Sequence, residues 1–142
     1  MNAIAGLDEP GFRARPVAGE WTAAEVLSHL LSTERIVINR AQAALAQKSD
    51  IVIPQTDDER QEGARLAQRL PVPQIVHGLL AQRRDTLRLL DRLSAGELAR
   101  RFQHQRWGER TVVWLFERAA EHEEEHACQI RTLRAVGAPA GP

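Results

Sequence analysis

Two histidines stand one helical turn apart near the C-terminal end of the chain, at His122 and His126. A helix turns about 100° per residue, so His126 lies about 40° from His122 on the same face. Both fall within the apolar stripe of that segment, which consists of Leu115, Ala119, Ile130 and Leu133. Two imidazoles in this arrangement can share one metal ion. A third imidazole from a facing helix would leave coordination positions open for water or substrate.

The other candidate ligands differ in the direction they face. His29 lies at one margin of a wide apolar face on its own predicted helix, from which it can look into the protein interior. His77 lies roughly opposite the apolar face of its helix and is predicted to be exposed. His104 falls in a connection, where no direction can be assigned. Cys128 lies about 240° from His122, away from the histidine pair.

The elements that must position these side chains are helices. Apolar residues recur at helical spacing, and no segment alternates at period two for long. Thr22 with Glu25, and again Ser94 with Glu97, have the spacing of a helix capping box. These patterns predict an all-α fold, an antiparallel four-helix bundle. Its predicted helices span residues 22–47, 57–70, 73–93 and 109–136.

The segments between these helices carry weaker signals. Residues 51–53 are apolar but too closely bracketed to form a sheet strand, and 102–108 is predicted to be an irregular connection. Gly63 is expected to interrupt the short polar helix. The helix at 73–93 has an apolar face that is predicted to consist of Ile75, Val76, Leu79, Leu80, Leu87 and Leu90.

The overall composition excludes several classes of protein. The 142 residues carry 19 basic and 19 acidic side chains, so a general attraction to nucleic acid or anionic lipid is not expected. The single cysteine cannot form an internal disulfide, and no apolar run is long enough to span a membrane. The first residues do not resemble a signal peptide, so we expect a cytoplasmic protein. It is predicted to be one domain, 1–142, with a lead-in at 1–20 and a loose tail at 137–142.

Three segments together resemble a known family. Residues 21–30 (WTAAEVLSHL) resemble the "W…E-v-l-x-H-L" opening of the DinB-like, or YfiT-like, superfamily of metal-dependent four-helix bundles. Residues 107–111 resemble the glycine-containing start of that family's last helix, and residues 121–130 resemble its H-x-x-x-H-x-x-Q-I ending. The resemblance covers about residues 20 to 135, with the three motifs in the family's order.

The resemblance implies a divalent metal, commonly nickel or zinc, held by three histidines. Matched position by position, these ligands are His29, His122 and His126. It also implies a homodimer and, in the better-understood members, transfer or isomerisation with low-molecular-weight thiols such as bacillithiol, mycothiol or glutathione. The family name refers to induction by DNA damage, a stress response, and implies no activity on DNA.

A thiol substrate bearing a carboxylate or carboxamide would need a cationic anchor near the metal. Arg40 and Arg118 lie near the histidine sides of their helices and are candidates, although arginines at such positions are more often solvated surface residues. Glu34 falls within the apolar arc of the first helix. It could orient a metal-binding imidazole by accepting a hydrogen bond from its ring, or it could pair with a buried arginine. The sequence does not distinguish between these two roles.

Two other functions compete with a thiol-dependent transferase. One is a non-catalytic metal-binding protein of a stress response. The other is a zinc peptidase, because residues 122–126 match H-E-x-x-H, with Glu123 as the general base. The peptidase is the weaker alternative, since no His, Asp or Glu follows His126 to serve as a third ligand. A nucleic-acid function has the least support, because no basic run exceeds two residues.

Overall fold

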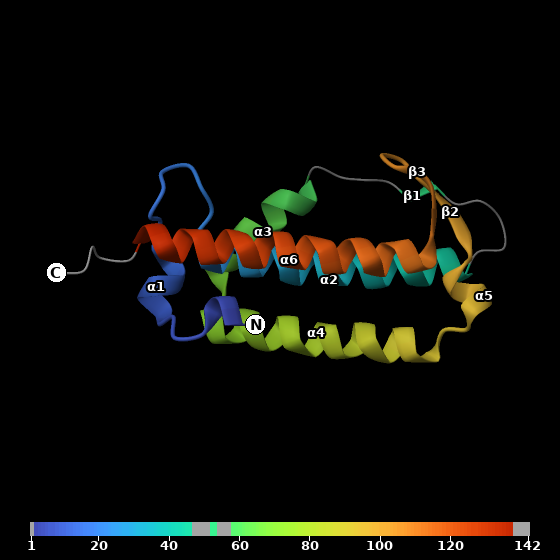
Figure 1. Cartoon of the computed structure of the whole chain (residues 1–142), viewed down its shortest axis with the longest axis horizontal. Coiled ribbons are helices and arrows are strands. Elements are labelled where there is room, and N and C mark those ends of the chain that lie inside the picture. The colour runs from blue at the N-terminus through green and yellow to red at the C-terminus, as the bar shows by residue number, and fades with distance from the viewer. Residues whose placement is uncertain (1, 47–51, 54–57, 138–142) are drawn as a thin grey trace.

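The computed structural model describes residues 2–46, 52–53 and 58–137, and in this part of the chain it confirms the predicted four-helix bundle (Figure 1). Three short helical elements accompany the bundle: η1 (Asn2–Ile4), α1 (Glu9–Arg13) and α5 (Ala95–Leu98). The four long helices are α2 (Ala23–Ala46), α3 (Asp58–Arg69), α4 (Val72–Arg92) and α6 (Val112–Gly137).

Helix α2 is the centre of the bundle and packs against α3, α4 and α6. Its start has the predicted capping box: the backbone N–H of Thr22 donates to Glu25 at 2.7 Å, and that of Glu25 donates to Thr22 Oγ1 at 3.2 Å. The second predicted capping box, at Ser94 and Glu97, is also present and begins α5. Both local predictions hold because capping depends on residues three positions apart and needs no tertiary contact.

The buried side chains form two clusters along α2. One surrounds Val26 and Ile75, where α2 meets α3 and α4, and the other surrounds Phe102 and Val112 near the start of α6. The predicted apolar face of α4 is too wide, because Leu80 and Leu87 are 43% and 55% exposed. Helix α4 packs on α2 through the narrower face that includes Ile75 and Leu79, so apolar residues at its margin stay exposed to solvent.

A small three-stranded sheet corrects the prediction that the chain has no strands. The strands are β1 (Val52–Ile53), β2 (Arg101–His104) and β3 (Gly108–Thr111). Strands β2 and β3 form an antiparallel hairpin, and β1 pairs with β2 in parallel, with Val52 opposite Gln103. The connection expected at 102–108 is therefore mostly sheet, and α6 begins after β3. Strands of two to four residues are too short to show a period-two pattern, and β1 depends on a partner distant in sequence.

Some predicted boundaries fall on residues outside the described ranges. These include the end of the first predicted helix at 47, position 51 of the apolar piece, and the start of the second helix at 57. Of the tail predicted at 137–142, Gly137 belongs to α6 and the remaining residues lie outside the described part of the chain. No described helix combines the length and the apolar character that crossing a membrane would require.

The imidazole of His104 is buried inside the β2–β3 hairpin. It is 2% exposed, and its Nδ1 atom accepts the backbone N–H groups of Arg106 at 3.1 Å and Trp107 at 3.4 Å. The indole of Trp107 packs against the imidazole with ring centroids 4.4 Å apart. Gly108 follows with φ of 69°, a left-handed conformation that glycine adopts without strain. His104, which could not be placed from the sequence, therefore closes the turn.

This burial predicts an acid-sensitive stability that can be measured. Burial, together with the charges of Arg40, Arg106 and Arg110, lowers the pKa of His104. Below about pH 6.5 the unfolded chain binds a proton at this position more readily than the folded chain does. The free energy of unfolding therefore decreases as the pH is lowered. In His104→Asn, an oxygen can replace Nδ1 as acceptor and nothing titrates. Urea unfolding between about pH 7 and 5 should therefore show a shallower pH dependence in the variant; equal slopes would contradict the prediction.

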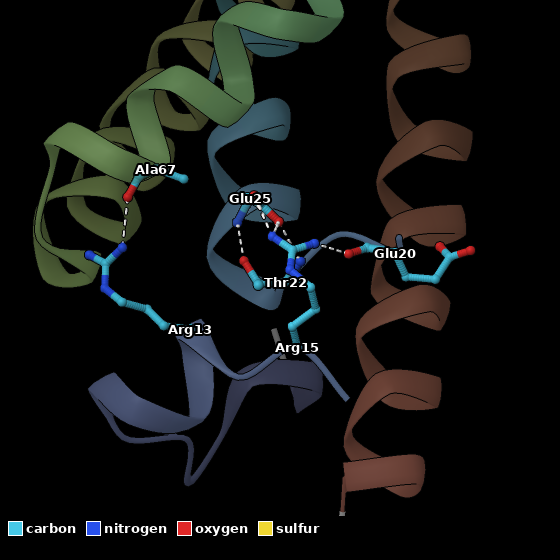
Figure 2. A network of polar contacts seen from close by, with 6 residues as sticks. All are labelled: Arg13, Arg15, Glu20, Thr22, Glu25 and Ala67. Atoms are coloured by element: carbon cyan, nitrogen blue, oxygen red, sulfur yellow. Dashed lines mark hydrogen bonds and ion pairs between the residues drawn. The ribbon is translucent and has the colours of Figure 1, made fainter. Parts of the chain in front are cut away.

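Two arginines of the N-terminal lead-in form hydrogen bonds with the bundle (Figure 2). Arg13 donates to the carbonyl oxygen of Ala67 at 2.7 Å, near the C-terminal end of α3. Arg15 donates to both carboxylate oxygens of Glu25 at 2.9 Å and to the backbone carbonyl of Glu20. The lead-in therefore holds the C-terminal end of α3 and the N-terminal end of α2 in place.

Candidate metal centre

The tertiary fold brings His29, His122 and His126 together. His29 comes from α2 and the other two from α6, and one ring nitrogen of each lies within 4.8 Å of the others. The Nε2 atom of His122 is 3.2 Å from that of His29 and 3.1 Å from that of His126. Among the described residues, this is the one group of three or more histidine, cysteine or acidic side chains able to hold a metal ion.

The spacing of these nitrogens fits a single ion. A tetrahedral ion with Zn–N bonds of 2.0–2.1 Å separates its ligand atoms by about 3.3 Å. The two short Nε2–Nε2 distances are close to this value. A neutral imidazole has only one N–H group, so the Nε2 atom of His122 cannot satisfy two facing ring nitrogens by hydrogen bonding alone. A cation at the centre would accept a lone pair from each.

Gln129 fixes the orientation of one of the three imidazoles. Its side-chain oxygen lies 2.7 Å from Nδ1 of His126, so the ring donates its N–H there and directs the lone pair of Nε2 toward the other histidines. Gln129 belongs to the H-x-x-x-H-x-x-Q-I motif, which by itself indicates no role for it. Its position three residues after His126 on one helical face is the signal that could have identified it.

Trp21 forms an aromatic wall beside the histidines. Its ring centroid is 5.0 Å from that of His29, and it stacks nearly parallel to the ring of His126 at 6.2 Å. The backbone is held on both sides of Trp21, because the Glu20 carbonyl accepts from Arg15 and the Thr22 N–H donates to Glu25 (Figure 2). The sequence predicted only that Trp21 packs at the start of the helix, and its place beside two histidines follows from the tertiary fold.

Gly63 allows α3 to cover His29. A Cβ atom at this position would lie 2.6 Å from the Cα of His29, closer than real Cβ contacts. Residue 63 lies within an uninterrupted α3, so the expectation that it breaks this helix is wrong. The glycine serves a close approach of two helices. His29, which the sequence placed at the margin of its apolar face, is only 8% exposed as a result.

The environment of His122 favours the neutral form of its imidazole. Burial first, and then the nearby charges of His126 and Arg118, lower the pKa of His122 to about 4. A histidine must be neutral to bind a metal, so this environment suits a ligand. Arg118 donates to both carboxylate oxygens of Glu125 at 3.1 and 3.2 Å and pairs with Glu121. Arg118 therefore lies near the histidines but already has acidic partners.

Arg40 and Glu34 lie elsewhere. Arg40 is close enough to His104 to lower the pKa of that residue, after the larger effect of burial. It follows His29 by eleven residues on α2, about 16 Å along the helix axis, so it does not adjoin the three histidines. Glu34 is 4% exposed and accepts from Thr86 Oγ1 at 2.6 Å, and Arg83 lies 3.2 Å from its other oxygen. Of the two alternatives for Glu34, the structure shows pairing with an arginine.

The remaining candidates also face away from the three histidines. Glu123, the general base of the peptidase alternative, forms an ion pair with Arg83 of α4 on a different edge of α6. Glu123 is thus paired with a cation, and the structure gives no support to its role as the general base of an H-E-x-x-H peptidase. His77 is exposed, as its helical direction predicted. Cys128, which was predicted to point away from the histidine pair, is exposed as well.

Comparison with known proteins places the chain in a family. No curated protein matches its sequence. Among solved structures, the fold resembles that of YfiT from Bacillus subtilis, described as a probable metal-dependent hydrolase with an unusual four-helix bundle topology. The TM-score is 0.81 at 17% identity, over 94% of this chain and 77% of that one. The family model of the DinB superfamily matches residues 1–130. The chain, with its bundle and its group of three histidines, therefore belongs to the DinB superfamily.

Proposed function

We propose that the protein binds one divalent metal ion, nickel or zinc, through His29, His122 and His126, and that it is a metal-dependent enzyme of the thiol S-transferase type. The observation that carries the proposal is the convergence of three ring nitrogens from two helices within 4.8 Å. Imidazole nitrogen suits both metals. Three protein ligands leave at least one coordination position for a substrate, which is typical of reactive metal sites rather than structural ones.

The chemistry that the metal supplies is stabilisation of a thiolate at neutral pH, which makes the thiol a nucleophile. The thiol comes from a small molecule, because Cys128 is exposed and lies on another side of α6. In the reaction, the sulfur forms a bond to an electrophilic carbon, the leaving group departs with the electron pair of its bond, and the thiol proton passes to solvent. The three histidines hold the ion, and Gln129 orients one of them.

Two neighbouring side chains contribute to substrate binding in this proposal. The half-buried indole of Trp21 supplies an apolar wall that limits the access of water. Arg118 offers a cation near His122 for a carboxylate of the thiol, in exchange for its contact with Glu125. Arg40, at the far end of α2 from His29, could reach only the distal end of a long substrate.

A second candidate function is metal-dependent hydrolysis. It is favoured by the structural resemblance to YfiT, which is described as a probable metal-dependent hydrolase. Water would then take the place of the thiol as nucleophile. A non-catalytic metal-binding role is the third alternative, and it needs the same three ligands.

One experiment separates these functions. The protein, loaded with nickel or zinc, is assayed with a haloarene electrophile in the presence and absence of glutathione or cysteine, and with an activated ester. Turnover that requires both thiol and metal, and is lost in His126→Ala but kept in His77→Ala, is the expected result. Ester hydrolysis without thiol would favour the hydrolase. If the protein binds metal stoichiometrically but neither converts the haloarene nor hydrolyses the ester, the result would support a non-catalytic metal-binding role and contradict the enzyme proposal.

A further inference from the structure

A hollow lies between α2 and α4, apart from the metal centre. It has a volume of about 470 Å³, within the usual range for small-molecule sites. None of its lining residues comes from α6, which carries two of the three histidines. The lining residues are Arg35, Ile38, Asn39, Gln42, Gln82, Asp85, Arg88, Leu89 and Arg92, and we call this hollow the α2–α4 groove.

Helix α3 lies beside one end of the groove. Helix α3 spans 12 residues, whereas α2 spans 24 and α4 spans 21. Glu62 of α3 pairs with Arg35 at 3.5 Å, which places α3 at one end of the groove. On α2, the lining residues Arg35, Asn39 and Gln42 lie about 80–140° around the helix from His29. The groove and the metal centre therefore occupy different faces of α2.

The charges that line the groove are mainly positive. It contains three arginines and one acidic residue, Asp85, which contacts Arg88 at 3.6 Å at an exposed position. Arg92 donates through Nε to the backbone carbonyl of Arg88, and it has no acidic partner in the part of the chain that the structure describes. Arg88 and Arg92 stand one turn apart on the same face of α4, where two cations repel each other. A bound anion would remove this repulsion.

The polar neutral groups of the groove suit the same type of ligand. Asn39, Gln42 and Gln82 carry amide groups that can donate to oxyanions or accept from hydroxyls. Guanidinium groups bind carboxylates and phosphates through paired hydrogen bonds. Ile38 and Leu89 add a half-buried apolar surface. Side chains one helical turn apart are spaced about 6 Å, which suits two linked oxyanion groups rather than one.

We propose that the α2–α4 groove binds a small polyanion that carries at least two phosphate or carboxylate groups. The ligand is small because the hollow is bounded by two helices and measures about 470 Å³. A nucleic acid is not favoured, since the chain as a whole carries no net charge. The groove is independent of the metal centre, and binding to it does not depend on the three histidines.

The test uses isothermal titration calorimetry of the full chain at low ionic strength, with inorganic pyrophosphate, citrate and acetate as probes. We expect pyrophosphate or citrate to bind at least about tenfold more tightly than acetate, with an affinity that falls as salt is added. Tighter binding of pyrophosphate would indicate a phosphate ligand, and tighter binding of citrate would indicate a carboxylate ligand. Failure of both to bind, or equal binding of acetate, would overturn the proposal.

Variants locate the binding. The pair Arg88→Gln and Arg92→Gln should weaken the tighter probe by at least about tenfold. Arg84→Gln is the matched control, because Arg84 is an exposed arginine of α4 outside the groove, and it should change affinity less than about twofold. His126→Ala should bind the probe as well as the original protein does. Loss of binding in His126→Ala would assign the anion to the metal centre. A short DNA duplex that binds more tightly than either polyanion would assign the groove to nucleic acid. Either result would overturn the proposal.

Discussion

Replacing His126 with alanine is expected to remove nearly all bound divalent metal from the protein. His126 supplies one of three converging ring nitrogens, and its Nε2 lies 3.1 Å from that of His122. Loss of a group that merely orients a ligand commonly weakens metal binding about 10–100-fold, so loss of a ligand itself should exceed about 100-fold. Elemental analysis of the purified protein, together with competition against a chromogenic chelator, measures the change.

Two further variants make this prediction specific. His77→Ala removes an exposed histidine of α4 and should leave the metal content unchanged. Gln129→Leu keeps all three ligands but removes the acceptor that orients His126, and it should weaken binding by about 10–100-fold. Circular dichroism checks that each variant is folded. Full metal retention in His126→Ala, or no metal bound by the unmodified protein at neutral pH, would refute the assigned ligands.

Replacing Gly63 with alanine is expected to destabilise the bundle and to weaken the metal centre together. The new Cβ would lie 2.6 Å from the Cα of His29, so α3 and α2 must separate at the position of a ligand. Overpacking of this kind commonly costs about 1–3 kcal/mol. Because the obstacle is backbone, a side-chain rotation cannot relieve it. Urea unfolding of the metal-free protein measures the loss of stability, and chelator competition measures the loss of metal affinity.

Gly96→Ala is the matched control for this substitution. Gly96 is an exposed glycine of the short helix α5, and no atom lies within 4 Å of the position a Cβ would take. Alanine has the higher helix propensity, so the variant should be as stable as the original protein or slightly more stable, within about 1 kcal/mol. Metal affinity should not change. Equal effects of the two substitutions would show that the contact between Gly63 and His29 does not constrain the packing.

Sequence reasoning was most successful where a property depends on neighbours along the chain. The capping boxes at Thr22 and Ser94 form as predicted, because their hydrogen bonds link residues three positions apart. His122 and His126 lie on one face because helical geometry fixes their angle. His77 is exposed for the same reason. A helix determines which of its residues share a face, whatever packs against it.

Properties that depend on contacts between distant segments could not be read in this way. The parallel pairing of β1 with β2 joins residues about fifty positions apart, and neither strand is long enough to show its periodicity. Glu34 had two plausible partners, and only the placement of α4 selected Arg83 and Thr86. The α2–α4 groove likewise forms where two helices that are separate in sequence lie side by side.

The two histidines one turn apart were fixed by the sequence through the geometry of a single helix. The third ligand was a different matter, because His29 lay at the margin of its apolar face and its burial depended on what covered it. Helix α3 covers it, and can do so only because residue 63 has no side chain. Periodicity fixes directions within a helix, whereas the distance between two helices is set by the side chains that meet between them. That distance is what turned three separate histidines into one candidate metal centre.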